Sequence, residues 1–269
     1  MTSMTETPTG YDELSPCGEA ALAYARRGWW VFPCHTPLEG GSACSCSDGA
    51  ACEPKQRGKH PRTKQGLNDA TLDPKQIREW WTRWPDANVA IATGPSRLVV
   101  LDQDMAGVGA MAKLVAEYGE EISDTVQAAT GGGGYHLAYS APGVEIRNDQ
   151  GSEKHENKLG LGIDVRGVGG YIIAAPSLHV SGNRYEWIDG YGPEEHRLRA
   201  LPLPIIDRLL TPTKAQKTVE RVTVSELLQG VGEGERDWQM FRLASKLRYA
   251  DVPYEWALQL VSEAAANCS

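Results

Sequence analysis

The feature that most constrains this chain is an apolar run that ends in two aspartates, LVVLDQD, from Leu98 to Asp104. Because side chains alternate along a strand, Asp102 and Asp104 should point to the same side. Two neighbouring carboxylates repel each other and lose hydration unless a cation lies between them. Magnesium often fills this role, bound through one or two carboxylates together with substrate phosphates. The run therefore predicts a strand that leads into a metal site; a strand end with two solvated acids is the plain alternative.

A third acid and a histidine follow, each near the end of a predicted strand. Residues 160–177, GLGIDVRGVGGYIIAAPS, place Asp164 and Arg166 on one face of a short strand before a glycine turn. Residues 130–139, TGGGGYHLAY, lie between the acidic motifs. Their four glycines let the backbone pass close to a ligand, and His136 begins the next strand. This order favours a chemical role over three unrelated strand ends.

The order of these motifs resembles the archaeo-eukaryotic primase superfamily, and within it the bifunctional primase/polymerase (prim-pol) domain of phage and plasmid replication proteins. The family pattern is Asp-x-Asp/Glu, then a small residue-x-His, then an apolar residue and Asp. It falls here on Asp102 and Asp104, on Gly134-Tyr135-His136 and on Ile163-Asp164. Further matches are ALAYARRGWWVFP (21–33), GKHP (58–61), RGVGGY (166–171), PSLH (176–179) and GNRYEW (182–187). The resemblance covers roughly residues 17–210.

The resemblance implies an α+β fold with an RRM-like catalytic core, a mixed or antiparallel sheet and flanking helices, followed by a small all-α module. It also implies template-dependent nucleotidyl transfer on a single-stranded DNA template with NTP or dNTP substrates, as a DNA primase and DNA polymerase. Two Mg²⁺ or Mn²⁺ ions would activate the attacking 3′-oxygen and hold the triphosphate. Their ligands would be three carboxylates: Asp102, Asp104 and Asp164.

Other matched positions imply contacts to the nucleotide. His136 would belong to the catalytic set and hold the nucleotide's phosphates, and Arg166 would neutralise phosphate charge bidentately. The matched motifs add three further nucleotide-binding candidates: Lys59, Ser177 and His179.

A cluster of cysteines and histidines lies at about residues 34–60, in a stretch rich in Gly, Ser and Ala that cannot build a core. Its members are Cys34, His35, Cys44, Cys46, Cys52 and His60. Thiolate and imidazole ligands suit tetrahedral zinc, which would order such a loop; a reduced, flexible loop is the alternative. Family members with GKHP often carry a Cys-x-Cys…Cys insert just before it. The resemblance implies one structural zinc on His35, Cys44, Cys46 and Cys52, with His60 or Cys34 as a substitute ligand.

Five basic residues overlap this loop, and they form a candidate surface for template phosphates. They are Lys55, Arg57, Lys59, Arg62 and Lys64. A solvated loop is the alternative. The formal net charge of −8 argues mildly against a nucleic-acid-binding protein. Acids that hold metals are neutralised in the working complex, however, and local charge matters more than the sum.

Domain organisation follows from composition. The 269 residues, 41% of them hydrophobic, suffice for one sizeable domain and a small one. We expect a mobile tail over 1–14, a catalytic domain over 15–212, and a helical module over 217–269, separated by prolines and a polar run at 211–217. The end of the chain has no evident helix cap, so we expect a piece of a larger primase-helicase, with the helicase domain missing.

Two alternatives use the same residues differently. A metal-dependent nuclease could use the three acids, and a non-catalytic, zinc-stabilised DNA-binding module of a replication initiator could use the cysteine loop. No apolar run approaches the length of a membrane span, and the first residues, MTSMTET, lack a signal pattern. We therefore expect a cytoplasmic protein without a membrane partner, in the host cytoplasm if it is phage-encoded.

Overall fold

The structure is a computed structural model that describes residues 14–141, 143–150, 158–211, 240, 243–244 and 254–266. The chain divides into two compact units, residues 1–202 and 203–269. This division falls earlier than residue 212, where the sequence places the end of the catalytic domain. The expected tail over 1–14 lies outside the described residues except for Leu14, and so does most of the expected module over 217–269.

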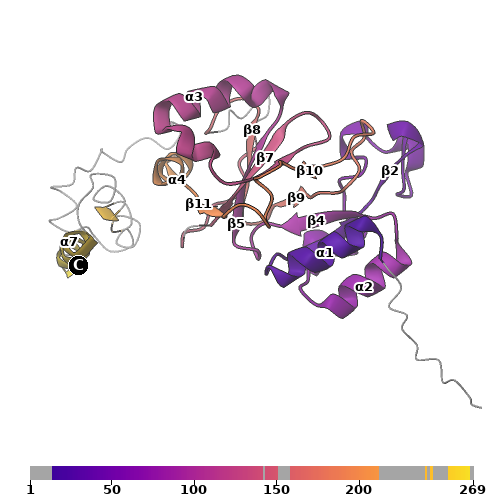
Figure 1. Ribbon diagram of the computed structural model, residues 1–269, viewed down its shortest axis with the longest axis horizontal. Coiled ribbons are helices and arrows are strands. Elements are labelled where there is room, and N and C mark those ends of the chain that lie inside the picture. The colour runs from indigo at the N-terminus through magenta and orange to yellow at the C-terminus, as the bar shows by residue number, and fades with distance from the viewer. Residues whose placement is uncertain are drawn as a thin grey trace, which may run out of the picture. The chain divides into compact units, whose positions relative to one another are not determined.

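Two capped helices pack together in the first unit: α1 (Pro16–Arg26) and α2 (Pro74–Arg83) (Figure 1). Each starts with a proline, which lacks the N–H that would be unpaired there. The hydroxyl of Ser15 accepts from the N–H of Gly18, and the carboxylate of Asp73 accepts from the N–H of Lys75. Both helix starts therefore follow from the local sequence, a capping side chain followed directly by proline.

Two sheets form the rest of this unit. The three-stranded sheet has the antiparallel order β1 (Val31–Cys34), β4 (Asn88–Ala92) and β9 (Tyr171–Ile173). The six-stranded sheet has the order β10 (Glu186–Trp187), β6 (Val126–Ala129), β7 (Tyr135–Ser140), β5 (Leu98–Gln103) and β8 (Ile163–Arg166), and β11 (Arg199–Ala200) pairs parallel with β7. A small ribbon joins β2 (Pro37–Leu38) to β3 (Ala43–Cys44). Helices with mainly antiparallel sheets confirm the expected α+β class.

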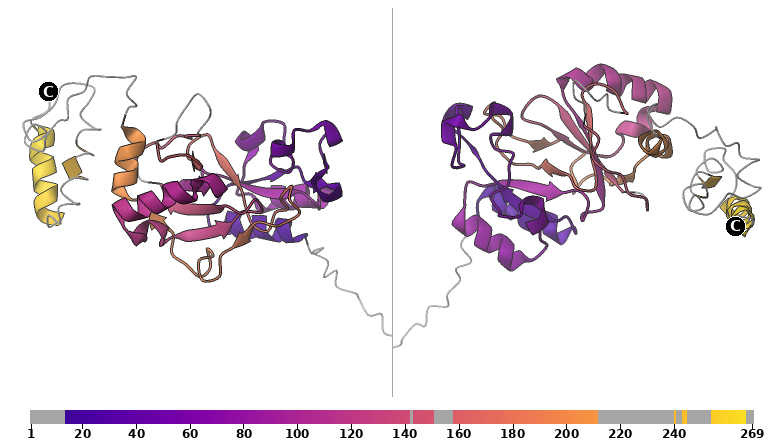
Figure 2. Two further views of the ribbon diagram at one scale, coloured as in Figure 1. Left: turned by 90° about the horizontal axis from the view of Figure 1, so that it is seen from above. Right: turned by 180° about the vertical axis from the view of Figure 1, so that it is seen from behind.

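Strand β5 runs from the core to the edge of a cavity. Leu98 and Val100, on one face, belong to a buried cluster that also contains Val89 and Ile91 of β4, so the two sheets share this core. Asp102 is the next residue on that face, and it lines the cavity. Helix α3 (Val108–Tyr118) lies on the opposite side of the unit from α1 and α2 (Figures 1 and 2). The site therefore begins where the apolar core between the sheets ends.

The second unit contains two longer described helices, α4 (Leu203–Leu210) and α7 (Tyr254–Ala266). Ile205, Ile206 and Leu209 form the buried face of α4. Within the described ranges, no helix has the length and apolar character needed to cross a membrane.

Candidate active site

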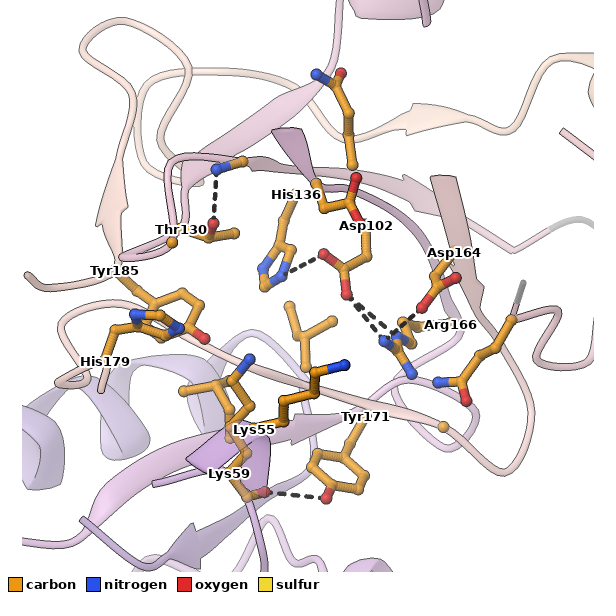
Figure 3. Close-up of a pocket in the computed structure, with 18 of the residues that line it drawn as sticks. Lys55, Lys59, Asp102, Thr130, His136, Asp164, Arg166, Tyr171, His179 and Tyr185 are labelled. Carbon is orange, nitrogen blue, oxygen red and sulfur yellow. Dashed lines mark hydrogen bonds and ion pairs between the residues drawn. The ribbon is translucent and has the colours of Figure 1, made fainter. Parts of the chain in front are cut away.

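Three predicted site residues form a row across the six-stranded sheet. In the antiparallel register, Asp102 of β5 is directly opposite His136 of β7 on one side and Asp164 of β8 on the other. Directly paired residues point to the same face, with Cβ atoms about 4.5–5.5 Å apart. Motifs that are distant in sequence are therefore brought together by strand pairing, as Figure 3 shows.

Both oxygens of Asp102 have cationic or polar neighbours. Oδ1 lies 3.4 Å from Nε2 of His136, and Oδ2 lies 3.0 Å from Nη2 of Arg166. Burial alone would raise the pKa of Asp102, but His136 and Arg166 together hold it well below the usual range. Asp102 is therefore ionised over the whole physiological range. The His136 ring is buried, and its Nδ1 has no hydrogen-bond partner among the described residues.

The position of Arg166 differs from the expectation that it binds phosphate directly. Its Nη2 contacts Oδ2 of Asp164 at 3.0 Å as well as Oδ2 of Asp102. Arg166 follows Asp164 by two residues on β8, so both side chains share one face. In this arrangement it neutralises the acid pair, which removes the repulsion expected from the sequence.

Asp104 lines the same cavity and also caps a short 3₁₀ turn. It lies just past β5, where its Oδ1 accepts a hydrogen bond from the N–H of Gly107 at 3.0 Å and so caps a short 3₁₀ turn. Its own N–H donates to the carbonyl of Gly162, 2.9 Å away. The side chain is exposed, unlike that of Asp102.

The glycine-rich turn before His136 is required by close backbone packing. A Cβ added at Gly131 would lie 2.2 Å from Cβ of His179, and one added at Gly134 would lie 2.1 Å from the carbonyl oxygen of Gln103. Thr130 stabilises the turn, since its hydroxyl accepts from the N–H of Gly134 at 3.0 Å. The glycines therefore hold the start of β7 against β5 and against His179.

These residues line one cavity of about 830 Å³, a volume typical of sites for small molecules. The predicted residues that line it are Lys59, Asp102, Asp104, His136, Asp164, Arg166 and His179. Carboxylates on β5, just past β5 and on β8 line this one cavity, and they are the oxygen ligands that Mg²⁺ and Mn²⁺ take.

Lysines lie across the cavity from the acids. Lys55 and Lys59 both point into it (Figure 3). Burial lowers the pKa of Lys59, and the charge of Asp102 opposes that shift. The hydroxyl of Tyr171 donates to the carbonyl of Lys59 at 3.0 Å and so ties this segment to β9.

Several lining residues were missed by the sequence reasoning. The ring of Tyr185 lies between His136 and His179, with centroid distances of 5.8 Å and 5.9 Å. Tyr185 and Tyr171 lie inside two of the motifs that match the family, GNRYEW and RGVGGY. Their place in these motifs could have marked them as candidates for the cavity lining. Gln150 also lines the cavity, and no sequence pattern marks it.

Ser177, expected to contact the nucleotide, lies outside the cavity. It is fully buried, and its hydroxyl accepts from the N–H of Val89 at 2.9 Å and lies 3.2 Å from the Val89 carbonyl. It does not line the cavity, so the structure does not support the predicted nucleotide contact. Its hydroxyl serves the backbone of β4.

A comparison with known families bears on this site. The family described as bifunctional DNA primase/polymerase, N-terminal, matches residues 21–204, which is more than half of the chain. The chain belongs to this family. The matched region contains the row of Asp102, His136 and Asp164 and ends close to the boundary between the two units. No curated protein matches the chain.

The prim-pol domain also contains a candidate zinc centre. Ligand atoms of four side chains lie within 4.8 Å of one another: Cys44, Cys46, Cys52 and His60. Nε2 of His60 is 3.3 Å from Sγ of Cys44 and 3.7 Å from Sγ of Cys52. A tetrahedral zinc with Zn–S of about 2.3 Å and Zn–N of about 2.0 Å has S···N edges of about 3.5 Å. Three cysteines and one histidine at these separations fit a closed structural site.

The histidine in this cluster is His60, whereas the sequence favoured His35 and kept His60 as a substitute. Nδ1 of His35 lies 3.1 Å from the hydroxyl of Ser45, and its ring stacks on His60 with centroids 4.7 Å apart. Cys34 is also outside the cluster; its thiol donates to the carbonyl of Lys59. His35 and Cys34 therefore support the loop around the cluster.

Four of the five basic residues of the loop divide into two kinds, and the fifth, Lys64, is exposed. Arg57 donates to the carbonyls of Gly41, Ala50 and Cys52, and so braces the loop from inside. Arg62 donates to the carbonyl of Cys34 and to Ser45. The two arginines therefore have hydrogen-bond partners within the loop, whereas Lys55 and Lys59 line the cavity.

Proposed function

We propose that this chain is a DNA primase/polymerase that joins nucleotides on a single-stranded DNA template at the row of Asp102, His136 and Asp164. The observation that carries the proposal is this row in one cavity, in a chain of the prim-pol family. Asp102, Asp104 and Asp164 would hold two Mg²⁺ or Mn²⁺ ions. When bound, such ions stabilise the attacking and leaving oxygens of an in-line displacement.

The remaining cavity residues position the substrate. His136 orients the Asp102 carboxylate through Nε2, and its position in the cavity lining supports a role close to the nucleotide's phosphates. Lys55, Lys59 and His179 offer donors on the facing wall, where triphosphate charge gains most from cationic neighbours.

The zinc site has a structural role in this proposal. Four protein ligands leave no open coordination position, so the metal would order the loop rather than react. Cys52 and His60 bracket residues 53–59, and this segment contributes Lys55 and Lys59 to the cavity wall. Zinc would therefore hold the nucleotide-facing lysines in place.

The wider setting is also part of the proposal. We place the chain in phage or plasmid replication, in the host cytoplasm, as the priming part of a larger primase-helicase. These statements rest on the family resemblance.

The test is an incubation of the purified chain with a single-stranded DNA template, labelled nucleotides and Mg²⁺ or Mn²⁺, with ribo- and deoxyribonucleotides in separate arms. The expected result is labelled product longer than one nucleotide, formed only with metal and template. Shortening of the DNA without nucleotides would instead indicate a nuclease. Template binding with neither reaction would indicate a non-catalytic initiator module.

A further inference from the structure

One nitrogen of Arg166 joins the two facing carboxylates of the row. Nη2 lies 3.0 Å from Oδ2 of Asp102 and 3.0 Å from Oδ2 of Asp164, and Nε lies 3.3 Å from the same oxygen of Asp102. The three side chains are mostly buried, with exposed fractions of 21–29%. In Figure 3 the dashed lines from both acids meet at the guanidinium. The cationic group between these acids is therefore a side chain of the protein itself.

The same two oxygens are the ligands that a cation bridging Asp102 and Asp164 would need. A guanidinium and a divalent cation repel each other strongly at such short separations in partly buried surroundings. They cannot both have close contact with this pair of oxygens. Metal binding there requires Arg166 to give up at least one of its two carboxylates.

A triphosphate would give the released guanidinium a new partner. Guanidinium groups bind phosphate oxygens bidentately, and Arg166 lines the same cavity as Lys55 and Lys59. The exchange keeps every charge paired, because the metal takes the carboxylates while the arginine takes phosphate.

We propose that Arg166 is an exchangeable counter-ion that leaves Asp102 and Asp164 for the substrate's phosphates as the divalent cation binds. This inference rests on the proposed function, since it assumes that the row holds metal. It makes metal and nucleotide binding reciprocal: each tightens the other by the same factor. With this exchange, the protein should bind the metal weakly in the absence of nucleotide and more tightly when the correct nucleotide is bound.

The contrasting role is a fixed ion pair that only orients the acids. In that case Arg166 stays on Asp102 and Asp164 throughout, and its removal loosens the metal ligands. The two roles therefore predict opposite changes in metal affinity when the arginine is removed.

The experiment measures Mn²⁺ binding to the full chain by electron paramagnetic resonance, for wild type and Arg166→Met. Exchange predicts that Arg166→Met binds Mn²⁺ alone about 5–150-fold more tightly than wild type, the usual range of such coupling. A non-hydrolysable dNTP analogue should tighten Mn²⁺ binding to wild type, after correction for Mn²⁺ on free analogue. It should do so much less in the variant.

Lys59→Met is the matched control for general charge, because Lys59 also places a positive charge near Asp102, whereas the group that bridges the two acids is Arg166. It should tighten Mn²⁺ binding less than Arg166→Met. If Arg166→Met does not fold by circular dichroism, Arg166→Lys gives the same test. A lysine has one point-like charge and should bridge the acids less well, so that variant too should bind Mn²⁺ more tightly than wild type.

The outcomes separate this inference from the proposed function. Mn²⁺ affinity that is unchanged or weaker in the arginine variants, or that rises equally in Lys59→Met, would overturn the exchange while leaving the metal site intact. A wild-type chain that binds no Mn²⁺ even with the analogue would overturn the metal site itself, and the exchange with it.

Discussion

Asp102 lies in the middle of the row, between His136 and Asp164, and its two carboxylate oxygens have different partners. His136 lies at Oδ1 and Arg166 at Oδ2. From the sequence alone, with no lysine close by in the chain, we expect replacement of Asp102 or Asp104 by alanine to leave the melting temperature unchanged or to raise it. Arg166 reverses this expectation for Asp102, because removal of the Asp102 carboxylate leaves the mostly buried guanidinium with only one of its two anionic partners.

Asp102→Asn should therefore lower the free energy of unfolding at neutral pH, by about 1–3 kcal/mol, the cost of leaving a buried charged hydrogen bond unmade. The folded-state pKa of Asp102 is depressed, so its contribution is fully present above the unfolded value of about 3.9 and is lost as pH falls through the lower folded value. The difference between wild type and variant should shrink below about pH 4 in urea titrations. A variant as stable as wild type at pH 7 would contradict this.

Asp124 provides a matched control for Asp102. It too has an arginine and a histidine as partners, Arg199 and His196, but it is more exposed and lies outside the cavity that holds Asp102. Exposed ion pairs contribute about 0–1 kcal/mol, so Asp124→Asn should change stability less than Asp102→Asn.

Substitutions of Asp104 can separate its structural role as the cap of a 3₁₀ turn from its proposed role as a metal ligand. Asparagine caps helical turns as well as aspartate, whereas alanine costs about 0.5–2 kcal/mol at such positions. Asp104→Asn should keep the melting temperature of wild type, and Asp104→Ala should lower it, while both lose metal-dependent nucleotide incorporation. If Asp104→Asn retains full activity, Asp104 serves only as the cap.

At the scale of elements, local patterns predicted much of the fold. Caps marked the starts of α1 and α2, and alternation predicted that β5 ends in acids on its cavity face. Side-chain direction and long-range partners were harder to predict. Arg166 contacts Asp102, which is 64 residues earlier in the sequence. The pairing of β5 with β8 brings the two together, and that pairing cannot be predicted from a local sequence pattern. The motifs also could not show that the Ser177 hydroxyl bonds to the backbone of Val89. Nor could they show that His60, and not His35, lies within ligand distance of the three cysteines.

The loop between β3 and α2 couples the zinc cluster to the cavity, and His60 and His35 form a test pair. His60→Ala should lose the zinc, because it removes one of four ligands, whereas His35→Ala should keep it. Elemental analysis of freshly purified protein would measure this. Loss of zinc should also weaken nucleotide binding, since residues 53–59 would no longer hold Lys55 and Lys59 in the cavity wall.

Zinc retained by His60→Ala but lost by His35→Ala would restore the ligand set favoured by the sequence. Cys17→Ala is the control for removing a thiol, because Cys17 is buried on α1 and does not belong to the cluster. It should retain one zinc per chain.

At the scale of the whole molecule, the chain divides after Pro202 and the family match ends at residue 204. A chain that stops at Thr211 should therefore fold and extend existing primers. Primer synthesis on bare template should fall, because holding two nucleotides without a primer needs additional contacts. Circular dichroism and paired extension and priming assays would check this, and an unfolded product would show that the first unit depends on the rest.

The most direct test of the central claim is the rate of metal-dependent nucleotide incorporation in Asp102→Asn and Asp164→Asn, with Asp124→Asn measured beside them. Metal stabilisation of a transition state is worth several kcal/mol, and each 1.36 kcal/mol is tenfold in rate, so both cavity variants should lose at least about 100-fold. Asp124→Asn should match wild type. A double variant, Asp102→Asn with Asp164→Asn, that incorporates nucleotides at the wild-type rate would contradict the claim that this row performs the reaction.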